Sequence, residues 1–126
     1  MSPSTLNAVV IDDNRQMADG LCRMLSLLDI NAQPAYGPRA AMLLLNDLQP
    51  DILFLDINMP GLDGFEVLAY IRRLPHMLDV PVVIVTSDDQ PETAEKALQS
   101  GALQVMIKPV SVTGLEDVLR KANFLK

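Results

Sequence analysis

Aromatic residues, cysteine and histidine are scarce in this chain of 126 residues. Tryptophan is absent, aromatic residues make up 4%, and the single cysteine, Cys22, can form no internal disulfide bond. One cysteine fits a reducing compartment, and Cys22 lies in a helical pattern, where we expect buried filler rather than a reactive thiol. The single histidine, His76, leaves no His and Cys cluster for zinc, and we expect it to be a solvated loop residue.

Long apolar runs and an excess of basic residues are also missing. No stretch approaches the ~20 apolar residues of a membrane span, and Met1–Thr5 lacks the basic and apolar regions of a signal peptide. The formal net charge of −6 argues against direct binding to nucleic acid or to anionic membranes. We therefore expect a soluble cytoplasmic protein with no direct nucleic-acid partner and no membrane partner.

What the chain does contain is an alternation of short apolar runs with helical patterns. Apolar residues make up 49% and charged residues 21%, which is ordinary for a globular domain. No repeat or linker divides the chain, so residues 1–126 are expected to form a single domain. Four runs predict buried strands, and a weaker fifth strand is predicted at Ala32–Tyr36. The four runs are Ala8–Ile11, Ile52–Leu55, Val82–Val85 and Val105–Ile107.

Helical periodicity follows each predicted strand. The predicted helices follow Asp13 to about Leu28, open at Gly37-Pro38 and reach Leu48, span Phe65–Arg73, lie between Asp89 and Gly101, and span Val112–Phe124. Continuous apolar runs are typical of strands that are covered on both faces, which indicates a parallel sheet with helices on each side. We therefore predict an α/β fold of the flavodoxin-like type, a three-layer sandwich around a five-stranded parallel sheet of order 2-1-3-4-5.

Turn and cap residues mark the boundaries of several of these elements. Pro60-Gly61 is a strong turn signal, and we expect Asp63 to serve the turn before Gly64. Asp88 and Asp89 are expected to cap the helix that follows them.

Polar residues stand directly after the apolar runs. Asp12 and Asp13 follow the first strand, Asp56 the third, Thr86 the fourth and Lys108 the fifth. The carboxyl ends of parallel strands meet at one edge of the sheet, and ligands bind there in open sheets. In the order 2-1-3-4-5, the first and third strands lie on either side of the switch point. We therefore expect three carboxylates, one hydroxyl and one ammonium group to share a small volume.

Three carboxylates held this closely need compensating cations. Two unit charges ~4.5 Å apart repel by roughly 3–4 kcal/mol at an effective dielectric constant of ~20. Lys108 is one cation, and Mg²⁺ is the natural second, with Mn²⁺ as an alternative, because hard divalent ions prefer oxygen ligands. With a metal bound, the Asp56 carboxylate can attack phosphorus and form an acyl phosphate. Thr86 and Lys108 can then stabilise the phosphoryl oxygens.

The residues at these positions resemble those of bacterial two-component response-regulator receiver domains. The stretch Asp56-Ile-Asn-Met-Pro-Gly-Leu-Asp-Gly64 is similar to their phosphorylation loop. The rest of the receiver pattern follows in order along essentially the whole chain, with Asp12-Asp13, Thr86-Ser87, Gly101-Ala102 and Lys108-Pro109.

The resemblance implies a role for each site residue. Asp56 would be the phospho-acceptor, while Asp12, Asp13, Asp56 and the backbone carbonyl of Asn58 would hold Mg²⁺. Thr86 would contact the phosphoryl group and move with it, and Lys108 would pair with its oxygens. Receiver domains hold the corresponding Lys-Pro bond in the cis form, and Lys108-Pro109 has the dipeptide for it.

The resemblance also implies a phosphorylation-dependent signalling switch in a two-component phosphorelay, not a conventional enzyme. A sensor histidine kinase or a histidine phosphotransfer domain would donate the phosphoryl group. The receiver would catalyse only its own phosphorylation and dephosphorylation. The switch would signal to an unidentified partner protein. It could also form a homodimer through the face of the fourth helix, fifth strand and fifth helix. Both a stand-alone receiver and a domain of a longer protein fit the sequence.

One position departs from the receiver pattern. Receivers usually carry Tyr or Phe on the fifth strand where this chain has Val105, so we expect a muted or differently routed conformational response. A pseudo-receiver that acts as a binding or dimerisation module without phosphorylation is therefore the alternative. An Asp-nucleophile phosphatase or mutase is disfavoured because Asn58 stands where its second acid would be. A flavin carrier is disfavoured because no phosphate loop rich in Ser, Thr and Gly follows the first strand.

Overall fold

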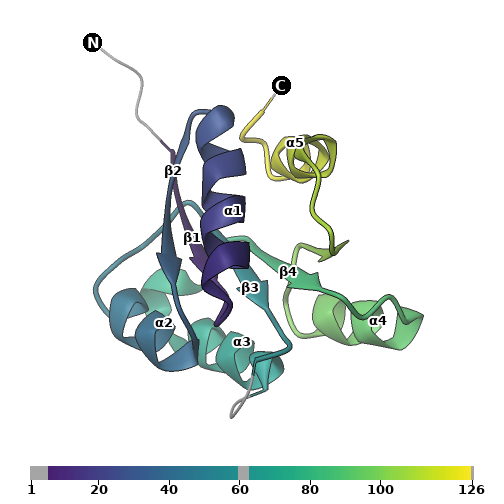
Figure 1. The fold of residues 1–126 in the computed structure, drawn as a ribbon. Coiled ribbons are helices and arrows are strands. Elements are labelled where there is room, and N and C mark those ends of the chain that lie inside the picture. Colours follow the sequence, from purple (N-terminus) through teal and green to yellow (C-terminus); the bar gives the residue numbers. More distant parts are fainter. Residues whose placement is uncertain (1–5, 60–62, 126) are drawn as a thin grey trace.

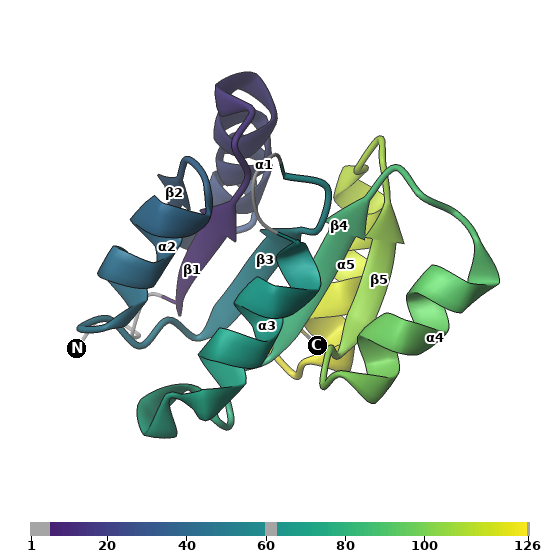
Figure 2. The ribbon, with the colours of Figure 1, turned by 90° about the horizontal axis from the view of Figure 1, so that it is seen from below.

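The computed structural model describes residues 6–59 and 63–125 (Figure 1), and its strands form a five-stranded sheet in the order β2-β1-β3-β4-β5. All neighbouring strands pair in parallel, which confirms the predicted fold class and strand order (Figure 2). The strands are β1 (Leu6–Ile11), β2 (Ile30–Ala35), β3 (Ile52–Asp56), β4 (Val82–Thr86) and β5 (Gln104–Ile107). The turn predicted at Pro60-Gly61 lies outside the described residues.

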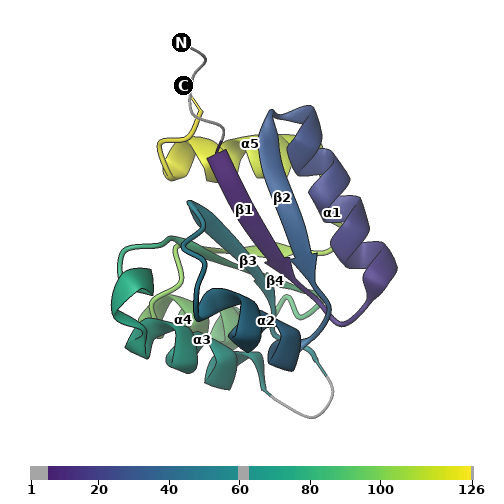
Figure 3. The same ribbon diagram turned by 90° about the vertical axis from the view of Figure 1, so that its left-hand side faces the viewer.

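Helices cover both faces of the sheet, as the continuous apolar strands predict. The helices are α1 (Arg15–Leu27), α2 (Pro38–Leu45), α3 (Gly64–Arg73), the short 3₁₀ helix η1 (Pro75–Met77), α4 (Pro91–Gln99) and α5 (Val112–Lys121). Figure 3 shows α1 and α5 on one side of the sheet and α2, α3 and α4 on the other.

Two apolar layers result, one on each face. Alternate strand residues point to opposite faces, so Phe54 packs with Leu25 and Leu115 beneath α1 and α5. The neighbouring Leu55 packs with Val67 on the α2–α3–α4 face. With helices on both faces, the carboxyl ends of the strands are the first place to look for a ligand site.

Some predicted boundaries were wrong by a few residues. Strand β2 begins at Ile30, before the predicted Ala32, and ends at Ala35. Helix α2 ends at Leu45, before the predicted Leu48, because Asn46 and Asp47 have low helix propensity. Helix α5 ends at Lys121, not Phe124, because Asn123 takes a left-handed conformation with φ of 66°.

Arg72 of α3 links the segments that precede β4 and β5. Its half-buried guanidinium donates hydrogen bonds to the carbonyl oxygens of Met77 (2.9 Å), Val80 (2.8 Å) and Gly101 (2.9 Å). Gly101 has a φ of +102°, which only glycine adopts readily. These bonds fix where β4 and β5 begin, and so where their carboxyl ends lie. Among the described residues, no helix has the length and apolar character needed to cross a bilayer.

Candidate functional site

The pairing of β1 with β3 brings Asp12 level with Asp56. Ile11 is the partner of Leu55 in this ladder, so the residues that follow them leave the sheet side by side. Each carboxylate accepts a hydrogen bond from the backbone N–H two residues on: Asn14 to Asp12 Oδ1 (3.0 Å) and Asn58 to Asp56 Oδ1 (2.9 Å). Both residues are buried, with Asp12 5% and Asp56 4% exposed as whole residues. The same local geometry therefore presents the second oxygen of each carboxylate to one space.

Lys108 enters that space from the end of β5. Its backbone N–H donates to the Thr86 carbonyl oxygen (2.8 Å), which continues the β4–β5 ladder beyond the strands. The Lys108 Nζ lies 3.4 Å from Asp12 Oδ2 and 3.5 Å from Asp56 Oδ2. The Lys108–Pro109 peptide bond is cis, as the resemblance implied. One ammonium group is thus shared by two buried carboxylates through long contacts.

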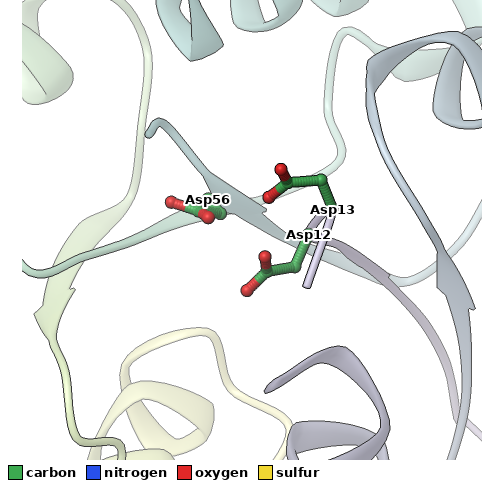
Figure 4. A group of neighbouring side chains, drawn as sticks. All are labelled: Asp12, Asp13 and Asp56. Carbon is green, nitrogen blue, oxygen red and sulfur yellow. The ribbon is translucent and has the colours of Figure 1, made fainter. Parts of the chain in front are cut away.

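Asp13 completes a cluster of three carboxylates. One oxygen each from Asp12, Asp13 and Asp56 lies within 4.8 Å of the others, and Asp13 is the exposed member. Figure 4 shows the three side chains around a common space beyond the ends of β1 and β3. An oxygen-only donor set with an exposed side suits Mg²⁺, which keeps several of its waters. The residues present therefore fit the predicted divalent cation.

Burial sets the electrostatics of the Asp12 carboxyl. It raises the pKa of Asp12 above the ordinary value, and the neighbouring charge of Asp56 raises this pKa further, while the Asn14 N–H and Lys108 oppose both effects. Three carboxylates face one ammonium group, so the negative charge is only partly compensated. A cation that binds here is stabilised by that residual charge.

Thr86 lies beside this cluster and is held by two donors. Its side chain is fully buried, and its Oγ1 accepts hydrogen bonds from the Asn58 Nδ2 (2.7 Å) and the Asp88 N–H (3.0 Å). The sequence offered only a backbone role for Asn58, and its side-chain contact with Thr86 was missed. Nothing in the spacing of Asp56 and Asn58 signals that contact, because it depends on a rotamer that tertiary packing selects.

Carboxylates next to the starts of α3 and α4 differ in their roles. Asp63, which was predicted to serve the turn before Gly64, is the N-cap of α3 and accepts a hydrogen bond from the Phe65 N–H. The N-cap of α4 is Gln90, so the prediction that Asp88 or Asp89 caps this helix was wrong. Asp88 instead accepts hydrogen bonds from the Gln90 N–H (2.9 Å) and from Thr93 Oγ1 (2.6 Å). It therefore joins the loop after β4 to the first turn of α4.

Two other predictions needed correction. His76 is not a solvated loop residue: it lies in η1, half-buried, with its Nε2 2.7 Å from the Leu45 carbonyl oxygen. Cys22 is half-buried rather than buried. Burial, and then the charge of Asp19, raise the pKa of its thiol to about 11, so it is protonated and unreactive at neutral pH.

Val105 lies on β5, opposite Ile84 of β4. It is half-buried and packs against the apolar layer on the α2–α3–α4 face. A valine in this position fills space in that layer but brings no polar group and no long side chain towards Thr86.

Comparisons with known proteins agree with this fold and identify the family. Residues 8–120 match the family model of the response regulator receiver domain. The chain belongs to the response regulator receiver family. It is 34% identical over 121 residues to the positive alginate biosynthesis regulatory protein of Pseudomonas aeruginosa, covering 94% of this chain and 47% of that protein. It is 31% identical over 114 residues to regulatory protein AtoC of Escherichia coli, covering 90% of this chain and 24% of that protein.

Solved structures of receiver domains show the same fold. The chemotaxis response regulator CheY4 of Vibrio cholerae superimposes with a TM-score of 0.87 at 21% identity, over 94% of this chain and 99% of that one. A receiver domain from Colwellia psychrerythraea gives a TM-score of 0.84 at 28% identity, over 92% of this chain and 96% of that one. This receiver domain spans about half or less of the length of the two curated relatives. It is a regulatory domain of two-component signalling, and its acidic cluster suits a metal ion.

Proposed function

We propose that this receiver domain is a phosphorylation-dependent switch in a two-component phosphorelay and that Asp56 accepts the phosphoryl group. The position of Asp56 carries this proposal. Asp56 is buried at the end of β3, and its carboxylate lies 3.5 Å from the Lys108 Nζ and is clustered with those of Asp12 and Asp13. A carboxylate nucleophile needs neighbours of this kind, because they stabilise the charge that spreads over the phosphoryl oxygens.

A phosphohistidine of a sensor histidine kinase or a histidine phosphotransfer domain is the proposed donor. An Asp56 carboxylate oxygen forms the bond to phosphorus while the bond between phosphorus and the imidazole nitrogen breaks. The nitrogen keeps the electron pair of that bond. Water later attacks the acyl phosphate, which restores the carboxylate and releases inorganic phosphate. In this scheme the domain catalyses only its own phosphorylation and dephosphorylation.

The carboxylates of Asp12, Asp13 and Asp56 and the backbone carbonyl of Asn58 would hold Mg²⁺, with Mn²⁺ as an alternative. When bound, the ion neutralises charge on the carboxylates and on the phosphoryl oxygens. Lys108 pairs with a phosphoryl oxygen from its place between Asp12 and Asp56. Thr86 Oγ1 already accepts two hydrogen bonds, so its hydroxyl proton is the group left to donate to the phosphoryl group.

The proposed output surface is the face of α4, β5 and α5. Large apolar side chains are exposed on these elements or just beside them, with Leu98 52%, Ile107 43% and Val112 36% exposed. We propose that these side chains contact an output protein or a second copy of the chain. We propose that residues 1–126 form one domain that acts in the cytoplasm, either alone or within a longer protein.

The test is phosphorylation of the purified chain by acetyl phosphate, followed by intact mass spectrometry. With Mg²⁺ the wild type should gain the mass of one phosphoryl group, and EDTA should prevent this. Asp56→Asn should abolish the gain, while Asp89→Asn, which changes an exposed carboxylate outside the cluster, should leave it intact. An Asp56→Asn protein that is still modified would overturn the assignment. No modification of any variant would favour the pseudo-receiver alternative.

A further inference from the structure

A pocket opens on the side of the sheet that α1 and α5 cover, between α1 and the segment that joins β5 to α5. Its volume is about 210 Å³. The walls are largely apolar and come from elements far apart in the sequence, including Val10 of β1, Phe54 of β3, Met17 of α1 and Val110 after β5. Helices α1 and α5 both lie on this face (Figure 3). The pocket marks the part of the sheet that the two helices do not cover.

The size of the pocket limits what it can hold. An apolar cavity of about 150 Å³ accommodates benzene, whereas sites for drug-sized ligands are typically about 300–1,000 Å³. The pocket therefore has room for one ring with a small substituent. Met17 and Met24, both on its α1 wall, have flexible side chains that adapt to such a ring.

Gly20 helps to keep the pocket open. It lies on the α1 wall, in the interior of a helix, where glycine is less favourable than alanine. Its backbone does not require glycine, because no positive φ is found there. A Cβ built on Gly20 would meet only the Nη2 of Arg23, at 3.9 Å. The consequence of glycine here is open space beside the pocket.

The charges that line the pocket determine which substituent on the ring is favoured. Asp12, Asp56 and Lys108 are all part of the lining, so two carboxylates and one ammonium group give this end a net charge of −1. An anionic group would meet two carboxylates, and a neutral group would leave their repulsion unchanged. A cationic group would share the compensating role that Lys108 fills through contacts of 3.4 and 3.5 Å.

We infer that this pocket is a binding site for a small organic cation in which one apolar ring carries an amidinium or ammonium group. The ring lies against the apolar walls, and the cationic group faces Asp12 and Asp56. This inference does not depend on phosphorylation of Asp56. A bound cation would occupy the carboxylates proposed for Mg²⁺, so such ligands are expected to act as antagonists of the metal site.

The test compares three probes that share one ring and differ in charge: benzamidine, benzamide and benzoate. Each is titrated into the ¹⁵N-labelled chain in metal-free buffer, and amide shifts report the affinity and the location. Benzamidine should shift the amides of Val10, Gly20 and Val110. Benzamide should bind at least about tenfold more weakly, equivalent to about 1.4 kcal/mol, and benzoate more weakly still.

Two substitutions are designed to fill the pocket, and a third, outside it, serves as their control. Gly20→Leu and Val110→Phe should each weaken benzamidine binding at least about tenfold, equivalent to about 1.4 kcal/mol. Leu27→Ala, on the exposed far end of α1, should leave the affinity unchanged. The inference fails if the shifts lie elsewhere, if both filled variants bind like the wild type, or if benzamide or benzoate binds as tightly as benzamidine.

Discussion

The carboxyl edge of the sheet and the flank formed by α4 and β5 follow the receiver pattern to different degrees. At the edge, Asp12, Asp56 and Lys108 meet within 3.5 Å contacts, set by strand register. On the flank, Val105 stands at the position where the receiver resemblance leads us to expect Tyr or Phe. Chemistry that depends on the ends of paired strands is fixed once the sheet forms. A readout that depends on single side chains can change while that chemistry stays intact.

The flank nevertheless has its own connections to the site. The Asp88 N–H donates to Thr86 Oγ1 (3.0 Å), and the Asp88 carboxylate accepts from Thr93 Oγ1 (2.6 Å) in the first turn of α4. Farther along α4, the Nζ of Lys96 lies 4.3 Å from the ring centroid of Phe65 in α3. The two Asp88 contacts link Thr86 to α4 without residue 105, and the Lys96 contact links α4 to α3. They are a physical basis for a differently routed response.

The largest loss of stability is expected from Gly64→Ala, which disrupts the carboxyl edge of the sheet. A Cβ at Gly64 would lie 2.3 Å from the Ile57 Cα, directly after Asp56, so the backbone on one side must move. We expect a loss of about 3 kcal/mol or more in the free energy of unfolding, measured by urea denaturation. Gly20→Ala is the control and should instead stabilise by about 0.5–1 kcal/mol. Equal stability of the two variants would contradict the close packing of Gly64 on Ile57.

A smaller loss of stability is expected from Lys108→Met. The substitution leaves the Asp12 and Asp56 carboxylates, with side chains 7% and 5% exposed, without their shared cation. We expect a loss of about 2 kcal/mol in EDTA at pH 7, measured by urea denaturation. Lys121→Met, at the exposed end of α5, should change the stability by less than about 0.5 kcal/mol. An unchanged stability of Lys108→Met would mean that Lys108 does not compensate these carboxylates.

The smallest effect on stability is expected from Thr93→Val, on the flank. The Thr93 hydroxyl, and then the Gln90 N–H, lower the pKa of Asp88 below its ordinary value of 3.8. A lowered folded-state pKa gives stabilisation that is present above 3.8 and is lost as the pH falls through the folded-state value. Thr93→Val should raise the pKa of Asp88 towards 3.8 and weaken this pH dependence.

The measurement is a ¹³C NMR titration of the Asp88 carboxyl carbon. The control is Thr113→Val, on the exposed surface of α5. A pKa of Asp88 that stays the same in Thr93→Val would contradict the link between the loop after β4 and α4.

The fold and the edge were predictable because they depend on pattern. Continuous apolar runs such as Ile52–Leu55 predict strands covered on both faces, and once the strands are parallel their following residues must meet. The contact of Asn58 with Thr86 and the pocket beside Gly20 were not predictable. They depend on rotamers and on how closely helices pack, which periodicity does not encode. The end of α5 was missed because Asn123 can continue a helix or end it in the left-handed conformation.

The most direct test of the account is an NMR comparison of the edge and the flank. Beryllium fluoride and Mg²⁺ are added to ¹⁵N-labelled wild type, Asp56→Asn and Val105→Tyr. The account predicts large amide shifts at Asn58, Thr86 and Lys108 in the wild type and in Val105→Tyr, and none in Asp56→Asn. Along β5 it predicts larger shifts in Val105→Tyr than in the wild type. Absent shifts at the edge of the wild type, or equal β5 shifts in the two proteins, would contradict it.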